Sequence, residues 1–295
     1  MFAVIPKDQQ GWIRALSAVE IPVLHQTVVQ LAHLRENESR IVGRDISRVV
    51  LRDPMFILRV LRFLQERRRT RQSTEVTTVE HALMMMGISP FFRNFSDLPS
   101  VESKLADAPE ALAGFLRVIN RARRAALYAR DWAGIRSDIE SDEVVIAASL
   151  HDMTEMLLWC FAPPLALRLV QLQQQERTMR SGDAQKAVLG FKLTDLHLAL
   201  ISEWKLPALL QSLMHETQVR QPRALNVVLA VNLARHSANG WDDPALPDDY
   251  AAIGELLKMS NREVLERIEL TEIQAEIERT RYQPEGAPEQ TPPAG

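Results

Sequence analysis

Cysteine is nearly absent from this chain of 295 residues, since Cys160 is the only one. A disulfide framework is therefore excluded, and the composition fits a reducing compartment. Cys160 lies within an apolar run, which predicts a small, buried hydrophobic side chain rather than a reactive thiol.

Long hydrophobic runs are also missing. The first residues have no charged region followed by the apolar stretch of a signal peptide. No segment has the roughly 18 uninterrupted apolar residues that a membrane span requires. We therefore expect a cytoplasmic protein that has no membrane partner.

Neither sign of charge dominates the sequence. The 35 basic and 38 acidic residues give a net charge of -3. This balance provides no overall field that would attract nucleic acid or an anionic membrane. We do not expect nucleic acid as a partner, and any such binding would depend on a local cluster of basic residues, such as residues 66–71 at a helix end.

Two-residue alternation of apolar and polar residues is absent, whereas apolar residues recur at spacings of three and four. This pattern predicts an all-α fold, and a hydrophobic content of 46% suffices for a globular core. The predicted helices lie near residues 22–34, 45–51, 54–69, 79–87, 109–133, 142–160, 171–175, 193–200, 207–218, 222–238, 248–257 and 261–280.

The adjacent pair His151 and Asp152 is the most informative motif, in the stretch SLHDMTEMLL. It is preceded by IPVLHQTVVQLAHL, VVLRDPMFILRVLRFL and TTVEHALMMMGI, and followed by ISEWKLPALLQSLMHE. In order and spacing, these segments resemble HDOD domains, the HD-related output domains of bacterial signalling proteins, over roughly residues 21–257. The resemblance implies a helical fold of two packed parts and a role in signalling.

On this resemblance we divide the chain into five parts. An N-terminal segment, 1–19, precedes an N-terminal helical subdomain, 20–106. An HD-like helical bundle, 107–258, carries the His-Asp pair and is followed by a C-terminal helix, 259–282. The last residues, 283–295, are rich in proline and glycine and are predicted to be disordered.

The metal ligands that the resemblance implies are replaced in this chain. Arg121 stands where HD phosphohydrolases have their upstream histidine, Leu193 replaces a later histidine, and residues 231–232 are Val and Asn where a distal aspartate is expected. A guanidinium repels a metal ion, and an apolar side chain offers no lone pair. Hydrolysis in this class requires the ion. We therefore expect no catalytic residue, no metal and no cofactor.

The remaining pocket would consist of Arg121, His151 and Asp152. We hypothesise that Arg121 has replaced the metal ion as the cationic partner of Asp152. The alternative for His151 and Asp152 is an imidazole and a carboxylate that are satisfied within the helical core, as buried polar groups usually are.

A rearranged metal site is the competing interpretation. Asp195, His197, His215 and Glu216 are all of ligand type, and with the His-Asp pair they would serve a divalent-metal-dependent phosphohydrolase or a cyclic-nucleotide phosphodiesterase. However, Asp195 and His197 are two residues apart on a predicted helix and do not share a face.

Five arginines, at positions 117, 121, 123, 124 and 130, have spacings that place several on one helix face. They could line a pocket for a small anionic ligand such as a cyclic nucleotide, with Arg124, His197, His215 and Glu216 as contacts to that ligand or to a partner. The alternative is a set of ion pairs with nearby acidic residues.

Two apolar features concern packing. Met84, Met85 and Met86 indicate either an adaptable partner surface or flexible filling of gaps in the core. Trp204 is predicted to be a core anchor between helices.

Together with the resemblance to HDOD domains, these features favour a non-enzymatic regulatory output or adaptor module. We expect this module to bind another protein and to be gated by a small anion in the cavity left by the metal.

Overall fold

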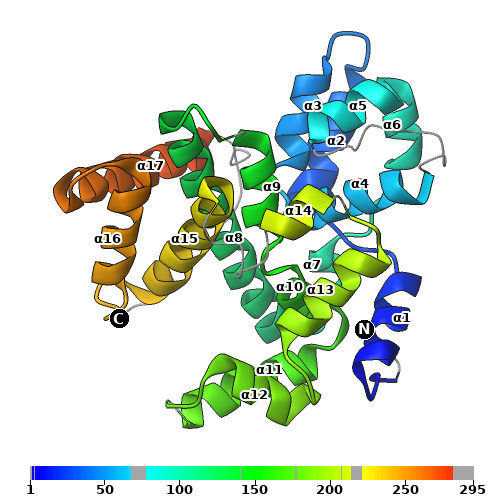
Figure 1. The fold of residues 1–295 in the computed structure, drawn as a ribbon. Helices are drawn as coiled ribbons and strands as arrows, with labels where there is room; N and C mark the ends of the chain where they lie inside the picture. Colours follow the sequence, from blue (N-terminus) through cyan, green and yellow to red (C-terminus); the bar gives the residue numbers. More distant parts are fainter. Residues whose placement is uncertain are drawn as a thin grey trace.

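The structure is a computed structural model that describes residues 2, 4–67, 78–139, 141–176, 178–206, 208–213 and 221–281. Within these ranges nearly every ordered element is a helix, and the sole strand-like pairing is an isolated parallel bridge between Val23 and Ser100. The predicted all-α fold is confirmed. A helical N-terminal part packs on a larger bundle (Figure 1).

The N-terminal part lies at the upper right of Figure 1, and its apolar helix α4 (Pro54–Arg67) lies along the lower side of this part. Pro54 begins α4 as predicted, and seven residues from Pro54 to Leu61 are buried. Its helices are α2 (His25–Glu36), α3 (Gly43–Val50), α4 (Pro54–Arg67), α5 (Val79–Met86), α6 (Ile88–Asn94) and the short α7 (Val101–Lys104).

The second part is built around α8, a helix of 27 residues that contacts several others. At 1.5 Å per residue it is about 40 Å long. Its helices are α8 (Pro109–Ile135), α9 (Ser141–Leu150), α10 (Met153–Phe161), α11 (Pro163–Gln175), α12 (Ser181–Leu189), α13 (Leu193–Glu203), α14 (Ala208–Leu213), α15 (Pro222–His236), the 3-10 turn η2 (Ser237–Asn239), α16 (Leu246–Leu257) and α17 (Asn261–Arg281).

The N-terminal segment contains a helix that the sequence analysis missed, α1 (Gln9–Ala18). Asp8 caps it by accepting a hydrogen bond of 2.7 Å from the backbone N–H of Gly11. Trp12 and Leu16 are buried, and the helix packs on α13 of the second part. Trp204 is buried as predicted, and its indole N–H donates to Ser17 at the end of α1 at 2.9 Å.

The prediction that a helix begins directly after Pro22 is wrong, because α2 begins at His25. Val23 is extended instead. Its N–H donates to the carbonyl of Pro99 at 2.9 Å, and its carbonyl accepts from the N–H of Val101 at 2.8 Å. This bridge fixes the start of α2 beside the start of α7. A further helix, α12, was also missed, and it ends at Gly190 in the left-handed conformation.

Residues 141–161 form an apolar stretch that meets the length and composition of a membrane span, with 83% of its window buried inside the protein. Core helices of globular proteins pass the same test. Here the stretch is divided between α9 and α10, whose contacts with α8 and α13 account for its apolar character.

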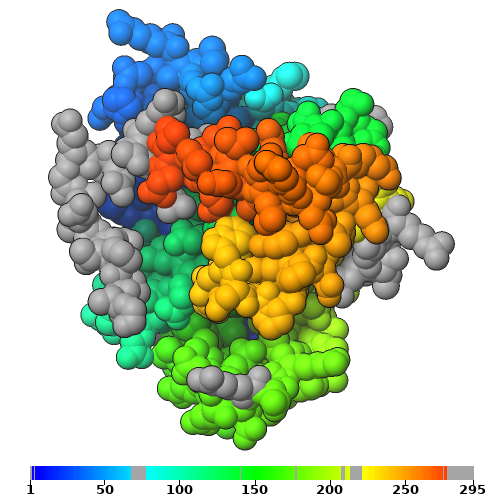
Figure 2. Space-filling view, turned by 90° about the vertical axis from the view of Figure 1, so that its left-hand side faces the viewer, coloured from blue at the N-terminus to red at the C-terminus, as the bar shows by residue number. Residues whose placement is uncertain are grey.

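The last helices form a band across one face of the molecule, coloured orange to red in Figure 2, between the N-terminal part above and α11 and α12 below. Ion pairs attach α17 to α8. Arg124 donates to Glu272 at 3.0 Å, and Arg267 pairs with Asp131. Ser260 and Glu263 form a capping box at the start of α17, in which Glu263 accepts from the N–H of Ser260 and donates its own N–H to the Ser260 hydroxyl.

Candidate functional site

His151 and Asp152 lie in a break between two helices. The prediction of one continuous helix through this pair is wrong, because α9 ends at Leu150 and α10 begins at Met153. Aspartate is a weak residue for helix interiors and favours caps and turns. The carbonyl of Asp152 accepts the first hydrogen bonds of α10, from Glu155 and Met156. The break leaves both motif side chains at the start of α10.

Close packing of α8 against α10 brings Arg121 to this break. A Cβ atom at Gly114 would lie 2.4 Å from the Trp159 ring, so glycine is required where the indole meets α8. Arg121 follows Gly114 by seven residues, and Asp152 precedes Trp159 by seven, which is two helical turns in each case. The two helices therefore run in opposite directions, and Arg121 meets Asp152.

Arg121 makes ion pairs with two carboxylates. Its Nε donates to Oδ2 of Asp152 at 2.8 Å, and its Nη2 lies 2.7 Å from the same oxygen and 2.6 Å from Oε2 of Glu155. The side chains of Arg121 and Asp152 are 19% and 18% exposed, so the contact is largely shielded from solvent. Arg121 is therefore paired with Asp152, as the hypothesis requires, whereas its replacement of a metal ion stays a prediction.

The ion pairs shift the pKa values of this group. Burial alone would raise the pKa of Asp152, but attraction to Arg121 and a hydrogen bond from His151 lower it far below its usual range. Burial raises the pKa of Glu155, and the proximity of Asp152 acts in the same direction, against the attraction of Arg121. Asp152 is therefore the more firmly ionised partner of the guanidinium.

His151 completes the group on the opposite side of Asp152. Its Nδ1–H donates to Oδ1 of Asp152 at 2.9 Å, since an ionised carboxylate only accepts. The ring of His197, a buried residue of α13, has its centroid 6.4 Å from that of His151. Asp195 is exposed on the same helix, so the prediction that Asp195 and His197 do not share a face is confirmed. We call Arg121, His151, Asp152, Glu155 and His197 the His-Asp pocket.

The other arginines of α8 do not join the His-Asp pocket. Arg124 contacts Glu272 of α17 and the carbonyl of Ser237. Arg123 donates to the carbonyl of Arg52 at 2.7 Å. Arg117 and Arg130 are exposed. Because three of the five guanidinium groups already bind acceptors of the protein in different places, they do not line a common anion pocket.

The donor set does not fit a catalytic metal ion. Within the ranges that the structure describes, no three histidine, cysteine, aspartate or glutamate side chains converge on one point. His215 and Glu216 lie outside the described residues. At the His-Asp pocket, Oδ2 of Asp152 binds the guanidinium of Arg121. The positive charge of that group would repel a metal ion at the same oxygen.

Sequence reasoning missed two acidic residues that matter here. Glu155 lies three residues after Asp152, one helical turn away, and that spacing was the available signal. Asp53 is fully buried, and its oxygens accept hydrogen bonds from the N–H groups of Leu24, Met55 and Phe56 and from the hydroxyl of Thr27. It joins α2 to α4, and no local sequence pattern reveals this.

The side chain of Met84 on α5 is 83% exposed, so Met84 is not a core residue. Met85 is 42% exposed. Of the two alternatives for this run, gap filling in the core is therefore excluded for Met84.

The helical fold agrees with the comparison to known families. The HDOD domain family matches residues 21–219, and this protein belongs to that family. A search of curated proteins finds no match.

Solved structures show the same fold at low sequence identity. The MmoQ response regulator from Methylococcus capsulatus is 16% identical with a TM-score of 0.60, covering 85% of this chain and 98% of its own. A virulence factor from Campylobacter jejuni is 15% identical with a TM-score of 0.62, covering 88% and 97%. At such identities the likeness shows the architecture alone.

Proposed function

We propose that this protein is a non-enzymatic regulatory module, an HDOD-type signalling output or adaptor that acts in the cytoplasm by binding another protein. The supporting observation is the pairing of Arg121 with Asp152 and Glu155, where the resemblance to HD phosphohydrolases implies a metal-binding histidine. A site whose carboxylate binds a guanidinium has no ion to lower the pKa of water or to neutralise a phosphate.

The HDOD family and a structural neighbour described as a response regulator support a signalling role. In this proposal a small anionic ligand gates the module by competing with the carboxylates for Arg121. Glu155 is the group that such a ligand would displace, since its side chain is 36% exposed and that of Asp152 only 18%. Displacement would free the start of α10 to move against α8.

The test is a combined measurement of metal content and turnover on the full chain. Elemental analysis follows dialysis of the purified protein against Mn²⁺, Fe²⁺ or Mg²⁺, and the same samples are assayed on phosphomonoesters, phosphodiesters and cyclic nucleotides. We expect no stoichiometric metal and no turnover beyond that of the His151→Ala variant. His33→Ala is the control for adventitious binding, because His33 is 76% exposed and distant in sequence from the pocket.

A stoichiometric ion together with turnover that His151→Ala abolishes and His33→Ala preserves would overturn the proposal. Such a result would support the alternative function, a divalent-metal-dependent phosphohydrolase or cyclic-nucleotide phosphodiesterase whose metal site includes residues near His215.

A further inference from the structure

Helix α17 has apolar residues on two opposite sides. Val264 and Ile268 are buried, on the side that packs against α8 and α16. Leu270, Ile273 and Ile277 are 51%, 49% and 47% exposed, and their spacings of three and four place them in one row. At about 100° per residue, this row lies opposite the buried side. We call these three residues the α17 stripe, and Figure 2 shows α17 on the outer side of the orange-to-red band.

The two flanks of the α17 stripe differ in charge. Glu269 and Glu276 are exposed along one flank, seven residues apart. Within the part of the chain that the structure describes, Glu269 makes no ion pair. The opposite flank carries Gln274 and Arg267, and Arg267 is already paired with Asp131 of α8. The stripe is therefore bordered by negative charge on one side and by a polar edge without net charge on the other.

The cations near the α17 stripe lie at its two ends rather than along it. Arg262 precedes the stripe and binds Glu266 at 3.0 Å, and Arg279 and Arg281 follow the stripe in sequence. The surrounding helices are acidic as a whole. Residues 237–281 include 11 acidic and five basic residues, whereas residues 1–236 include 25 acidic and 30 basic ones. Negative charge is therefore concentrated in the helices that carry the stripe.

An exposed aromatic ring lies beyond the acidic flank. Trp241 is 49% exposed, and the guanidinium carbon of Arg124 lies 5.5 Å from the centroid of its ring. Because Arg124 also donates to Glu272 at 3.0 Å, Trp241 lies beside α17. Glu272 precedes Glu276 by one helical turn, on the acidic side of the helix. A lysine or arginine that reached this flank would thus find apolar surface for its stem and carboxylates for its charged end.

The charge pattern argues against three other occupants. Glu269 and Glu276 would repel nucleic acid and an anionic membrane. Antiparallel pairing with a second copy of the chain would place these carboxylates opposite each other, and parallel pairing would leave them beside Gln274 without a cation. Three side chains also fall far short of the roughly 800 Å² that each partner of a stable dimer buries.

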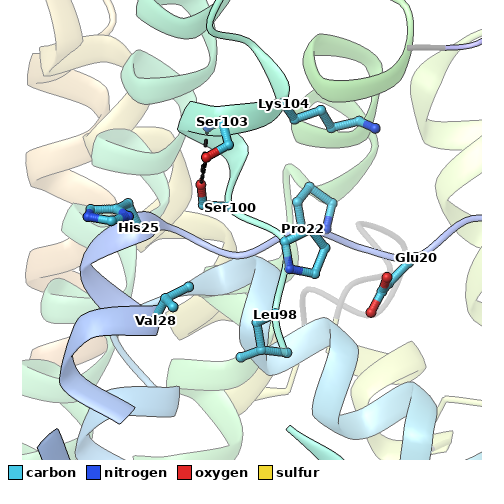
Figure 3. Close-up of a pocket in the computed structure, with 9 residues that line it drawn as sticks. Glu20, Pro22, His25, Val28, Leu98, Ser100, Ser103 and Lys104 are labelled. Carbon is cyan, nitrogen blue, oxygen red and sulfur yellow. Dashed lines mark hydrogen bonds between the residues drawn. The ribbon is translucent and has the colours of Figure 1, made fainter. Parts of the chain in front are cut away.

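The hollow beside α2 shows what a less selective surface looks like. It has a volume of about 490 Å³ between the start of α2 and residues 98–104, and it is drawn in Figure 3. Glu20 and Lys104 both line it, so charges of both signs are present and no occupant is favoured. The α17 stripe differs because its charged flank is acidic only.

We propose that the α17 stripe binds an amphipathic helix of a partner protein that carries lysine or arginine along one side. The apolar face of that helix would cover Leu270, Ile273 and Ile277. Helices that pack along an apolar seam place their flanking charges opposite each other, so the cations would meet Glu269 and Glu276. These carboxylates are separated by about 10 Å along α17, which sets the spacing of the cations. This inference rests on the proposed function, because it assigns a surface to the protein partner named there.

The test is a selection on the immobilised full chain from a phage library of helical peptides. Apolar residues are fixed at spacings of three and four, and the flanking positions are random. The expected result is enrichment of lysine and arginine on one flank only. In fluorescence anisotropy, the selected peptides should bind Ile273→Lys, and the double variant Glu269→Lys with Glu276→Lys, at least about tenfold more weakly than the wild type. All three positions are exposed, so these variants should fold, which circular dichroism checks.

The matched control is the double variant Glu36→Lys with Glu203→Lys, which makes the same change in net charge at exposed positions of α2 and α13. It should bind the peptides as the wild type does. A second selection, on Glu269→Lys with Glu276→Lys, should enrich aspartate and glutamate on the flank that carried the cations.

No enrichment, a flank without charge preference, or equal binding to Ile273→Lys would each overturn the proposed occupant. Light scattering that gives the mass of two chains for the wild type and of one for Ile273→Lys would assign the α17 stripe to a second copy instead. Retention on phosphatidylglycerol vesicles that Ile273→Lys abolishes would assign it to a membrane. None of these outcomes depends on metal content or turnover, so failure of this inference is separable from failure of the regulatory proposal.

Discussion

Two aspartates of this protein precede helices and use their carboxylates in opposite ways. Asp53 precedes α4 and accepts the N–H groups of Met55 and Phe56, so it caps its own helix while also holding α2. Asp152 precedes α10 but accepts no hydrogen bond from that helix through its side chain. It is bound by Arg121 and His151 instead. The first carboxylate binds the backbone at the start of its helix, whereas the second binds the side chains of Arg121 and His151.

The difference shows what holds the carboxylate of Asp152 in place in this chain. A carboxylate that caps a helix is fixed by the backbone, but one that faces a pocket needs a cation to offset its desolvation. In this chain that cation is a side chain of α8. The pocket is therefore closed by a contact between two helices, which is the kind of contact that a regulatory module could use to couple ligand binding to helix movement.

Replacement of Asp53 should have the largest effect. In Asp53→Ala, the N–H of Leu24, the hydroxyl of Thr27 and two N–H groups at the start of α4 lose their acceptor inside the core. We expect a loss of about 3 kcal/mol or more in the free energy of unfolding, measured by urea denaturation. Asp138→Ala, on an exposed ion pair with Arg136, is the control and should change stability little. Equal effects of the two variants would contradict the structural role of Asp53.

Removal of Arg121 should have the next largest effect. Arg121→Ala leaves the shielded carboxylate of Asp152 and the partly exposed carboxylate of Glu155 close together without a cation. We expect a loss of about 1–3 kcal/mol in the free energy of unfolding, with partial recovery in Arg121→Lys, which keeps the charge but not the geometry. Arg117→Ala, an exposed position on the same helix, is the control. An unchanged melting temperature for Arg121→Ala would show that the ion pair contributes nothing to the fold.

The two aspartates should also respond to pH in opposite directions. The pKa of Asp152 is lowered from its ordinary 3.8, so its stabilisation is present above that value and is lost as the pH falls below it. Burial raises the pKa of Asp53 from 3.8, so its contribution is fully present below 3.8 and is lost as the pH rises through the raised value.

Urea denaturation between pH 7 and 3.5 measures both contributions by comparing the wild type with Asp152→Asn and Asp53→Asn. Toward low pH, the difference in unfolding free energy between wild type and variant should narrow for Asp152→Asn and widen for Asp53→Asn. Differences that change in the same direction for both variants would refute the distinction between the two carboxylates.

The sequence was sufficient for the fold class and for the pairing of Arg121 with Asp152. Helical periodicity is a local property, and the position of Arg121 followed from the order of motifs that the chain shares with HDOD domains. The sequence was not sufficient for the acceptors of Leu24 and Thr27, because Asp53 is 29 and 26 residues away along the chain. Such contacts form only when helices pack, and no local pattern encodes them.

The break at His151 and Asp152 was missed for a related reason. The residues on both sides are apolar and favour helix, so periodicity alone continues α9 into α10. The preference of Asp152 for caps and turns is weak beside this apolar periodicity, and the contact of Trp159 with Gly114, 45 positions away along the chain, is not visible in a local pattern. The helix α1 was missed because its buried residues Trp12, Ile13 and Leu16 pack on the distant α13 rather than on their neighbours in sequence.

The smallest effect is expected at Arg124, which follows Arg121 by one helical turn and is equally shielded at 18% exposure. Its partner Glu272 also accepts a hydrogen bond from Tyr128, so Glu272→Ala removes two polar contacts between α8 and α17. Burial raises the pKa of Tyr128, which keeps its hydroxyl protonated as the donor.

In Glu272→Ala, Val264 and Ile268 still bury one side of α17. We therefore expect a loss below about 1 kcal/mol in the free energy of global unfolding, but faster amide hydrogen exchange within α17. Glu269→Ala, at an exposed position of α17, is the control. Unchanged exchange in α17, or exchange accelerated equally throughout the protein, would show that the contact between Arg124 and Glu272 does not anchor α17 to α8. Arg124 would then lack the structural role that we assign to Arg121.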